Sequence, residues 1–360
     1  MNKNELPYIL KRHDGSSDQS LRAHNAADEF LVNAFLDLDL NPNNSVLYND
    51  RFGFLSVYLN DYNHVSVITN KSQEKAIIKN ITSNNLTLPA FSDPLISLHD
   101  KVSFAFVKLP KSLDLFELFL QHICLNSEDN VTVFVGFMTR HFSPRLISIS
   151  EKYFINVSQS KAVKKARLLQ LSDKRTIDHY NNLKTIDFGD KTYKQYYGVF
   201  SADHIDYATQ FFLKHIEISS SDKKVLDLAS GNGIIACELA TQLSDAEFHL
   251  MDDSVLAVAS AKLNCNEDNI YHYCNNDMSI FEDNSFDLIV TNPPFHFEYE
   301  ININIPLNLF KDCHRCLMVG GSLQMVANKH LNYKSHLGKI FSSVITLEES
   351  EKFIIYKCVK

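Results

Sequence analysis

Residues 223–233 read KKVLDLASGNG, and residues 286–296 read FDLIVTNPPFH. Each stretch is a short apolar run that ends in polar or turn-forming residues, which is typical of a buried strand leading into a loop. Helical patterns follow at 234–243 and 307–317, and further strand-like runs lie at 248–251, 322–327 and 353–359. Strand and helix therefore alternate along the C-terminal half, which predicts a doubly wound, mostly parallel α/β sheet.

The N-terminal half has the same order of elements in a weaker form. Strand-like runs at 45–48 and 102–107 are followed by the loops 49–53 and 108–111. Val46 and Val107 lie 61 positions apart, and Val225 and Val290 lie 65 apart. The matching order and spacing predict an internal duplication, with one domain at 1–180 and a second at 181–360. The alternative is that any two α/β domains look alike at this level of detail.

Composition sets the broad class of the protein. Hydrophobic residues make up 45% of the chain and charged residues 22%, which suits globular domains with real cores. No apolar run reaches the roughly 18 residues of a membrane span, and residues 1–15 lack the hydrophobic core of a signal peptide. Seven irregularly spaced cysteines do not form a disulfide framework. We therefore expect a reduced, cytoplasmic chain with no membrane partner.

Charge is divided unevenly along the chain. The formal net charge is −8, but residues 1–175 hold 20 basic and 18 acidic side chains, whereas residues 176–360 hold 15 and 25. A polyanion is bound by a local basic surface, so the mean charge does not exclude a nucleic acid. Lys161, Lys164, Lys165 and Arg167 form the strongest basic patch, and a second basic run begins at Lys329. The alternative for the first patch is a solvated helix face.

The first candidate site surrounds the loop after the strand at 223–228. Asp227 precedes Gly231 and Gly233, and Asp252 ends the next strand about 25 positions later. A glycine turn lets a ligand approach the backbone, and an acidic residue at the next strand end accepts hydrogen bonds from ribose hydroxyls. The dinucleotide fingerprint GxGxxG is absent. Asp before G-x-G instead resembles the first motif of S-adenosylmethionine-dependent methyltransferases, which implies that cofactor, and its cationic amino group suits a nearby Asp.

The second candidate site is the Asn-Pro-Pro-Phe-His segment at 292–296. The Asn292 side-chain oxygen and the Pro293 carbonyl can accept both hydrogens of an exocyclic amine. They would direct the nitrogen lone pair toward a methyl donor and stabilise the positive charge that develops on nitrogen. Phe295 is suited to stacking on a planar base. These residue types predict methylation of a nucleobase or amide nitrogen.

Taken together, the chain resembles the ribosomal RNA guanine-N2 methyltransferases of the RsmC/RlmG family over nearly its whole length. The resemblance implies two tandem Rossmann-like class I methyltransferase domains with a degenerate N-terminal copy, S-adenosylmethionine as cofactor, and a monomer that acts on ribosomal RNA. The N-terminal segments are more similar to the large-subunit (23S) branch than to the small-subunit (16S) branch. The resemblance rests on 292–296 and on Ala26–Leu31, Lys165–Leu168, Val199–Ser201, Asp206, Asp252–Ser254, Ala257–Ser260 and Val326–Leu331.

The resemblance also assigns expected roles to single residues. Ala229 stands where the family motif has its first glycine, at the closest approach of the cofactor. Asn276 and Asp277 follow the strand that contacts adenine in this fold, and Phe200 would line the cofactor pocket, unless it is ordinary core packing. His296 is expected to pack against substrate rather than to act as a base. Cys313 and Cys316 look like half a zinc knuckle without a second pair, so no metal is expected.

The sequence leaves three alternatives to 23S rRNA guanine-N2 methylation open. One is small-subunit (16S) rRNA guanine-N2 methylation, and another is methylation of adenine N6 or of a protein glutamine, which uses a similar Asn-Pro-Pro-aromatic motif. The third is a non-enzymatic RNA-binding protein with a decayed site, favoured only by Ala229. The first repeat has Arg51 within its loop and Lys108 where the second has Asn292. It lacks both motifs, so we expect it to present RNA rather than to methylate.

Overall fold

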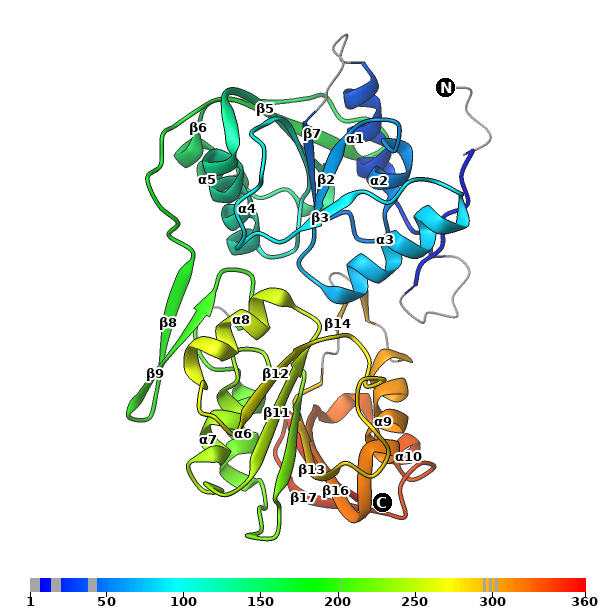
Figure 1. The fold of residues 1–360 in the computed structure, drawn as a ribbon, viewed down its shortest axis with the longest axis vertical. Helices are drawn as coiled ribbons and strands as arrows, with labels where there is room; N and C mark the ends of the chain where they lie inside the picture. The colour runs from blue at the N-terminus through cyan, green and yellow to red at the C-terminus, as the bar shows by residue number, and fades with distance from the viewer. Residues whose placement is uncertain are drawn as a thin grey trace. The chain divides into compact units, whose positions relative to one another are not determined.

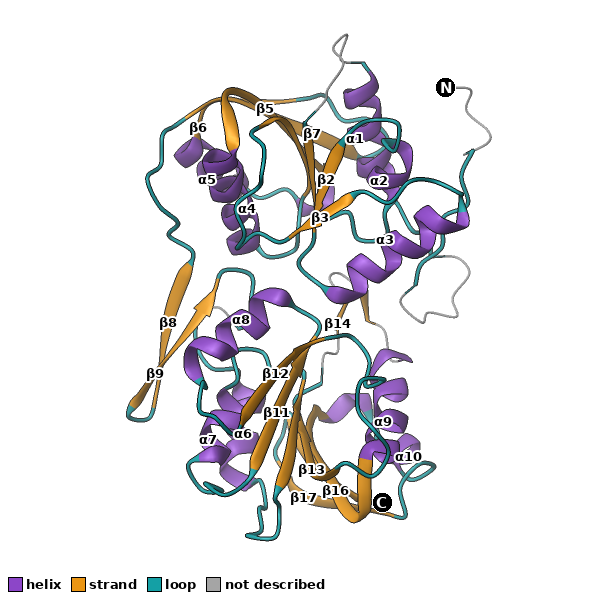
Figure 2. Ribbon diagram, in the orientation of Figure 1, coloured by secondary structure: helices purple, strands orange, loops and turns teal. Residues whose placement is uncertain are grey.

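The computed structural model describes residues 7–13, 21–37, 44–201, 203–293, 296–297, 300–301 and 304–360. The chain divides into two compact units between Asn182 and Leu183. Each unit is built on a seven-stranded sheet with helices on both faces, as the ribbons in Figures 1 and 2 show. Layers of this kind arise because a sheet that is apolar on both faces must be covered on both.

The first unit has the strand order β3-β2-β1-β4-β5-β7-β6. Strands β1 to β5 run parallel, and β7 and β6 continue the sheet in antiparallel pairing. Its elements are α1 (Ala26–Leu36), β1 (Ser45–Tyr48), α2 (Phe54–Tyr58), β2 (His64–Val67), α3 (Lys71–Ser83), β3 (Ala90–Ser92), β4 (Val102–Lys108), α4 (Leu113–Asn126), β5 (Ser127–Met138), α5 (Pro144–Tyr153), β6 (Phe154–Gln159) and β7 (Ala166–Lys174).

The second unit begins with the antiparallel hairpin β8–β9 and has the sheet order β12-β11-β10-β13-β16-β18-β17. Its last two strands are again antiparallel. Its elements are β8 (Leu183–Phe188), β9 (Lys191–Tyr196), α6 (Tyr207–His215), β10 (Lys224–Leu228), α7 (Ile234–Ala240), β11 (Glu247–Asp252), α8 (Val255–Asn264), β12 (Ile270–Cys274), β13 (Phe286–Thr291), β14 (His296–Phe297), β15 (Glu300–Ile301), α9 (Asn304–Cys316), β16 (Leu317–Asn328), α10 (Lys334–Leu337), β17 (Ser343–Glu349) and β18 (Phe353–Val359).

The two sheets share one topology, strand for strand. The first strand of each sheet, β1 or β10, lies third in the order, and the order reverses between it and the next strand, β4 or β13. Ligand sites of such sheets lie at the carboxyl ends of these strands. Register agrees as well: Tyr48 pairs with Val107 in the first unit, and Leu228 pairs with Thr291 in the second. The predicted tandem α/β fold is thereby confirmed.

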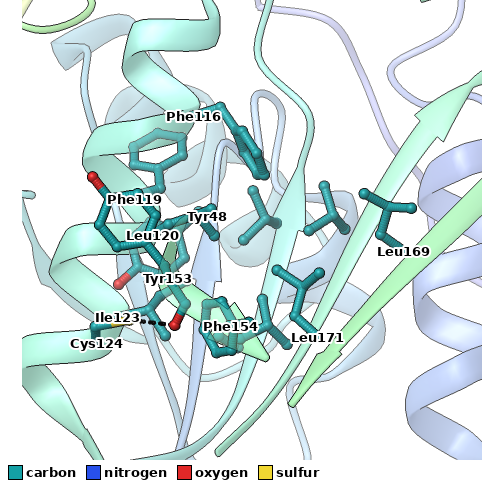
Figure 3. Packing of buried hydrophobic residues seen from close by; sticks show 14 of the residues in the cluster. Tyr48, Phe116, Phe119, Leu120, Ile123, Cys124, Tyr153, Phe154, Leu169 and Leu171 are labelled. Atoms are coloured by element: carbon teal, nitrogen blue, oxygen red, sulfur yellow. Dashed lines mark hydrogen bonds between the residues drawn. The ribbon is translucent and has the colours of Figure 1, made fainter. Parts of the chain in front are cut away.

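Each sheet has one apolar core on either face. In the first unit, α4 and α5 cover one face, and Figure 3 shows Tyr48, Phe116, Phe119 and Tyr153 gathered there in the same apolar cluster as Leu171 of β7. Leu31 and Phe35 of α1 pack with Leu47 on the opposite face. Central strands buried on both faces explain why they read as continuous apolar runs in the sequence.

One alternative and one expectation about local structure are wrong: the helix-face alternative for the basic patch, and the expectation that every cysteine is reduced. The basic patch is not part of a helix: Lys161, Lys164 and Lys165 lie in the connection between β6 and β7, and Arg167 lies in β7. Lys164 and Lys165 have φ of +48° and +63°, values that a turn uses and a right-handed helix does not. The cysteines are not all thiols, because Cys237 and Cys265 form a disulfide across a Cα–Cα distance of 5.8 Å. Spacing alone could not show that α7 packs beside the end of α8.

Candidate functional site

The loop after β10 holds three residues in the left-handed region of the backbone. Ala229, Gly231 and Gly233 have φ of +59°, +56° and +83°. A Cβ on Gly231 would meet no atom within 4 Å, so the loop is open at this position. A Cβ on Gly233 would lie 3.1 Å from both Ala261 Cβ and Cys265 Sγ. Gly231 therefore leaves room for a ligand, whereas Gly233 permits close packing of the loop on α8.

Two carboxyl groups hold this loop in place, the fully buried Asp227 and the partly buried Asp252. Asp227 Oδ2 accepts a hydrogen bond from Ala236 N–H at 3.0 Å, and Asp252 accepts from Gly231 N–H at 2.9 Å and from Ser254 N–H at 2.8 Å. Burial raises the pKa of Asp227 to about 7 and the pKa of Asp252 to about 6, against the opposing effect of these hydrogen bonds. Strongly raised carboxyl pKa values are a common feature of functional sites.

The loop has unsatisfied polar groups that suit a polar ligand. Asp227 Oδ1 and Ser230 Oγ are buried without a hydrogen-bond partner. Such orphaned groups are rare and call for an explanation, because each one left unpaired destabilises the fold. A cofactor with a cationic amine and ribose hydroxyls provides the donors that this loop and Asp252 can accept.

Ala229 provides a direct test of the loop, because an alanine in the left-handed region is strained. The left-handed conformation costs an L-residue about 1–2 kcal/mol relative to glycine. We expect Ala229→Gly to raise the thermal unfolding midpoint and to tighten S-adenosylmethionine binding, both measured on purified protein. Ala236→Gly, within the right-handed helix α7, serves as the control and should lower stability. Unchanged or weaker cofactor binding by Ala229→Gly would contradict the placement of the cofactor at this loop.

Asn292 follows β13 directly and lies at the same sheet edge as Asp227. Its amide nitrogen donates hydrogen bonds to Asp206 Oδ2 at 3.0 Å and to Thr209 Oγ1 at 2.9 Å, both at the start of α6. Pro293 is buried, and Phe295 lies outside the described residues. The structure thus brings together Asn292 and the first turn of α6, a contact that the sequence patterns did not reveal.

The remaining predicted cofactor residues lie in loops of the same unit. Asn276 and Asp277 follow β12, and Asp277 Oδ1 accepts hydrogen bonds from the backbone and hydroxyl of Ser279. Phe200 has 74% of its surface exposed, so the core-packing alternative for it is wrong. His296 lies in β14, and nothing is described of its side chain.

Gln195, a residue the motif analysis missed, connects two of these loops. It is 1% exposed on β9, accepts a hydrogen bond from Asn232 Nδ2 at 3.0 Å, and donates to the Ser201 carbonyl at 3.1 Å. The hairpin β8–β9 thereby ties the glycine loop to the segment that carries Phe200. Its only sequence signal is a polar residue at an inward position of an alternating strand.

The basic residues predicted to contact RNA differ in solvent exposure and in the side chains that they already bind. Lys161, Lys164 and Lys165 are exposed, and Lys164 pairs with Glu29 at 2.8 Å. Arg167 is half-buried, and its guanidinium donates to Gln159 Oε1 at 3.0 Å. Lys329 follows β16 and pairs with Glu349 at 3.4 Å. Exposed pairs of this kind contribute little to stability and can be exchanged for phosphate contacts.

The first unit keeps the backbone of the loop but not its chemistry. Asn49 and Gly53 have φ of +58° and +82°, close to the values of Ala229 and Gly233. Arg51 stands where Gly231 stands, and Lys108 occupies the position of Asn292. The Lys108 ammonium lies 2.5 Å from Asp28 Oδ2. An ammonium has only donors, so this position cannot accept the hydrogens of an amine.

The described residues were compared with the side-chain groupings of metal sites and with the helices that span membranes. Cys313 and Cys316 belong to α9 and are fully buried, and no three His, Cys, Asp or Glu side chains of the described residues are grouped so as to hold an ion. No described helix has both the length and the apolar character that crossing a membrane requires.

Comparison with known proteins adds a family assignment for both halves. The family model "Methyltransferase small domain" matches residues 190–357, and the model "RLMG N-terminal domain" matches residues 1–175. A protein of Psychromonas ingrahamii named ribosomal RNA large subunit methyltransferase G is 30% identical over 98% of this chain and 96% of its own length. The protein of the same name from Aeromonas hydrophila is also 30% identical, with the same coverage of both chains.

A solved structure shares the entire two-unit fold. It is a 16S rRNA N2 methyltransferase of T. thermophilus in complex with AdoMet and guanosine. The two chains superpose with a TM-score of 0.78 over 98% of each, at 17% sequence identity. At this identity the likeness concerns the fold.

Proposed function

Because this chain belongs to the family of ribosomal RNA large subunit methyltransferase G, we propose that it methylates the exocyclic N2 amine of a guanine in 23S rRNA. S-adenosylmethionine is the methyl donor, and the protein acts as a monomer in the cytoplasm. One observation in the structure supports this chemistry above the others. Both amide protons of Asn292 are bound by α6, which leaves its oxygen as the group that can accept a substrate amine.

The residues of the second unit have separable roles in this proposal. The loop at Ala229–Gly233 and the carboxylates of Asp227 and Asp252 bind the cofactor, which supplies an electrophilic methyl group on a sulfonium. Asn292 and the Pro293 carbonyl accept the two amine hydrogens and hold the nitrogen lone pair toward that methyl. When bound there, the cofactor would supply a methyl group that the nitrogen lone pair can attack, and the electron pair of the broken carbon–sulfur bond would remain on sulfur. The nitrogen then loses one proton to water.

The substrate must expose its base to reach Asn292. Duplex RNA hides the edges of its bases, so the target guanine leaves its stack or lies in an unpaired strand, where Phe295 and His296 are suited to contact it. The first unit lacks the acceptor and the open glycine loop, and its basic turn at Lys161–Lys165 suits the RNA backbone. We infer that residues 1–180 present rRNA and that residues 181–360 bind the cofactor and catalyse transfer.

The basic turn can be tested by reversing its charge. We expect Lys161→Glu, Lys164→Glu and Lys165→Glu together to raise the KM for rRNA and to flatten its dependence on salt, because up to three phosphate contacts are lost. Arg167 is left unchanged because it is half-buried. The control reverses Lys79, Arg145 and Lys152, which are also exposed in the first unit. Steady-state kinetics at several salt concentrations give both quantities, and equal effects of the two triple variants would contradict the assignment.

The substrate itself is identified by a separate experiment. In 23S rRNA from a strain that lacks the gene, one N2-methylguanosine should be absent, and the purified protein should restore it. The same preparation is offered 16S rRNA and release factor. Labelled methyl transfer to either of these, without transfer to 23S rRNA, would replace the proposal by the small-subunit or the glutamine alternative. No binding of S-adenosylmethionine by calorimetry would favour a non-enzymatic RNA-binding protein.

A further inference from the structure

We propose that the first turn of α6 is a positioning device for the catalytic asparagine, with Asp206 and Thr209 fixing which end of the Asn292 amide faces the substrate. This inference rests on the proposed function, because it explains how Asn292 acquires an acceptor. Neither residue contacts a reacting atom in this scheme. Both act through Asn292, from the helix N-cap position and from the third residue of the helix.

An asparagine side chain is symmetric in shape but not in chemistry. It carries two N–H donors and one carbonyl oxygen, and a half-turn about its last bond exchanges them. If the nitrogen faced the substrate, it would oppose the amine hydrogens instead of accepting them. Methyl transfer by the proposed mechanism therefore requires the nitrogen to face inward in nearly every molecule.

Asp206 makes that orientation chemically unambiguous. An ionised carboxylate only accepts hydrogen bonds, so the group 3.0 Å from Asp206 Oδ2 must be the amide nitrogen of Asn292. The same Oδ2 accepts hydrogen bonds from Ala208 N–H at 3.1 Å and Thr209 N–H at 3.2 Å, which fixes the carboxylate at the helix start. The negative charge of Asp206 also polarises the Asn292 amide, which makes the amide oxygen a stronger acceptor. The same charge stabilises the positive charge that develops on the substrate nitrogen.

Thr209 binds the second amide proton. Its Oγ1 lies 2.9 Å from Asn292 Nδ2, and the side chain is 8% exposed, so bulk water does not replace this contact readily. With both donors bound by rigid groups of one helix turn, the amide plane is defined as well as its direction. Preorganisation of this kind lowers the barrier because nothing has to reorient during the reaction.

The first unit has an equivalent helix turn at the start of α1, which binds a different side chain. Asn25 is the N-cap of α1 and Asp28 is its third residue, the same two helix positions as Asp206 and Thr209. They hold the Lys108 ammonium, with Nζ 2.9 Å from Asn25 Oδ1 and 2.5 Å from Asp28 Oδ2. The scaffold is thus present in both copies. Only in the second unit does the helix turn bind a side chain, Asn292, that still has an oxygen able to accept a hydrogen bond.

Single-turnover methyl transfer to unmodified 23S rRNA, with the full-length protein in excess, tests this proposal. Thr209→Val keeps the shape of the side chain but removes the acceptor, and Thr209→Ser keeps the acceptor. Asp206→Ser retains a helix cap but is too short to reach Asn292. We expect Thr209→Val and Asp206→Ser to lower the transfer rate about 10- to 100-fold. Binding of S-adenosylmethionine and of rRNA should stay within about twofold of the parent, and Thr209→Ser should recover most of the rate.

A double-mutant cycle separates positioning from general stability. If Thr209 acts through Asn292, Thr209→Val should cause no further loss once Asn292 is alanine. A wild-type rate for Thr209→Val, or its full loss repeated on top of Asn292→Ala, would overturn the positioning role. Failure of the proposed function looks different, because Asn292→Ala alone would then transfer methyl groups at the parent rate. Thermal unfolding midpoints of all variants show whether a loss reflects folding instead.

Discussion

Replacing Asn292 with alanine is expected to lower turnover by about 10²-fold or more, because the substrate amine loses one of the two acceptors that orient it. Asn292 contacts a nitrogen whose positive charge grows during transfer, so its removal should raise the free energy of the transition state and leave that of the bound substrate nearly unchanged. The kcat should therefore fall while the KM for rRNA and the affinity for S-adenosylmethionine change little. Labelled methyl transfer and calorimetry measure these quantities on the same protein.

The control for this change is Asn308→Ala. Asn308 is exposed on α9, and the proposed mechanism gives it no function. It removes the same side chain from the same unit and should leave turnover unchanged. Turnover by Asn292→Ala at the level of this control would show that the Asn-Pro-Pro segment does not carry the chemistry. A parallel loss of cofactor affinity would instead mean that Asn292 supports the cofactor loop.

The sequence predicted those elements whose formation depends on residues adjacent in the chain. β13 and β18 were predicted at the residues where the structure has them, because each is a compact apolar run buried in the sheet. β6 and β7 were not predicted. β6 is the edge strand and has mostly exposed side chains, so its apolar patterning is weak, and the connection that leads into β7 is rich in lysine. The antiparallel strand β17 was missed for the same reason.

The site divides in the same way. Asp227, Gly231, Asp252 and Asn292 could be predicted to lie together because strand ends of a parallel sheet meet at one edge, although their roles in binding and catalysis stay predictions. Thr209 and Gln195 were not found, because they act through partners 83 and 37 positions away in the chain. A polar residue three positions after a helix cap carries no signal of such a contact. Only the pairing of α6 with the end of β13 reveals it.

Asp252→Ala is expected to weaken S-adenosylmethionine binding about 10- to 100-fold, because a hydrogen bond to a charged acceptor contributes about 1.5–3 kcal/mol. The carboxylate would accept from the ribose hydroxyls while it also holds Gly231 N–H at 2.9 Å. Its loss removes a ligand contact and an anchor of the loop together. Asp253→Ala removes an equal charge from the adjacent position and should leave the affinity nearly unchanged. Calorimetric titration of both variants measures the difference.

The protonation of Asp252 gives the same prediction a second readout. Burial raises its pKa to about 6, so the group is ionised at pH 7.5 and increasingly neutral as the pH falls through 6. A neutral carboxyl has one acceptor fewer, and the affinity for S-adenosylmethionine should therefore fall over that range. The Asp252→Asn side chain does not titrate, so this variant should lose the part of the pH dependence of affinity that comes from residue 252. The part that comes from Asp227, whose pKa is raised to about 7, should remain. An unaltered pH profile in Asp252→Asn, together with parental affinity, would place the ribose away from β11.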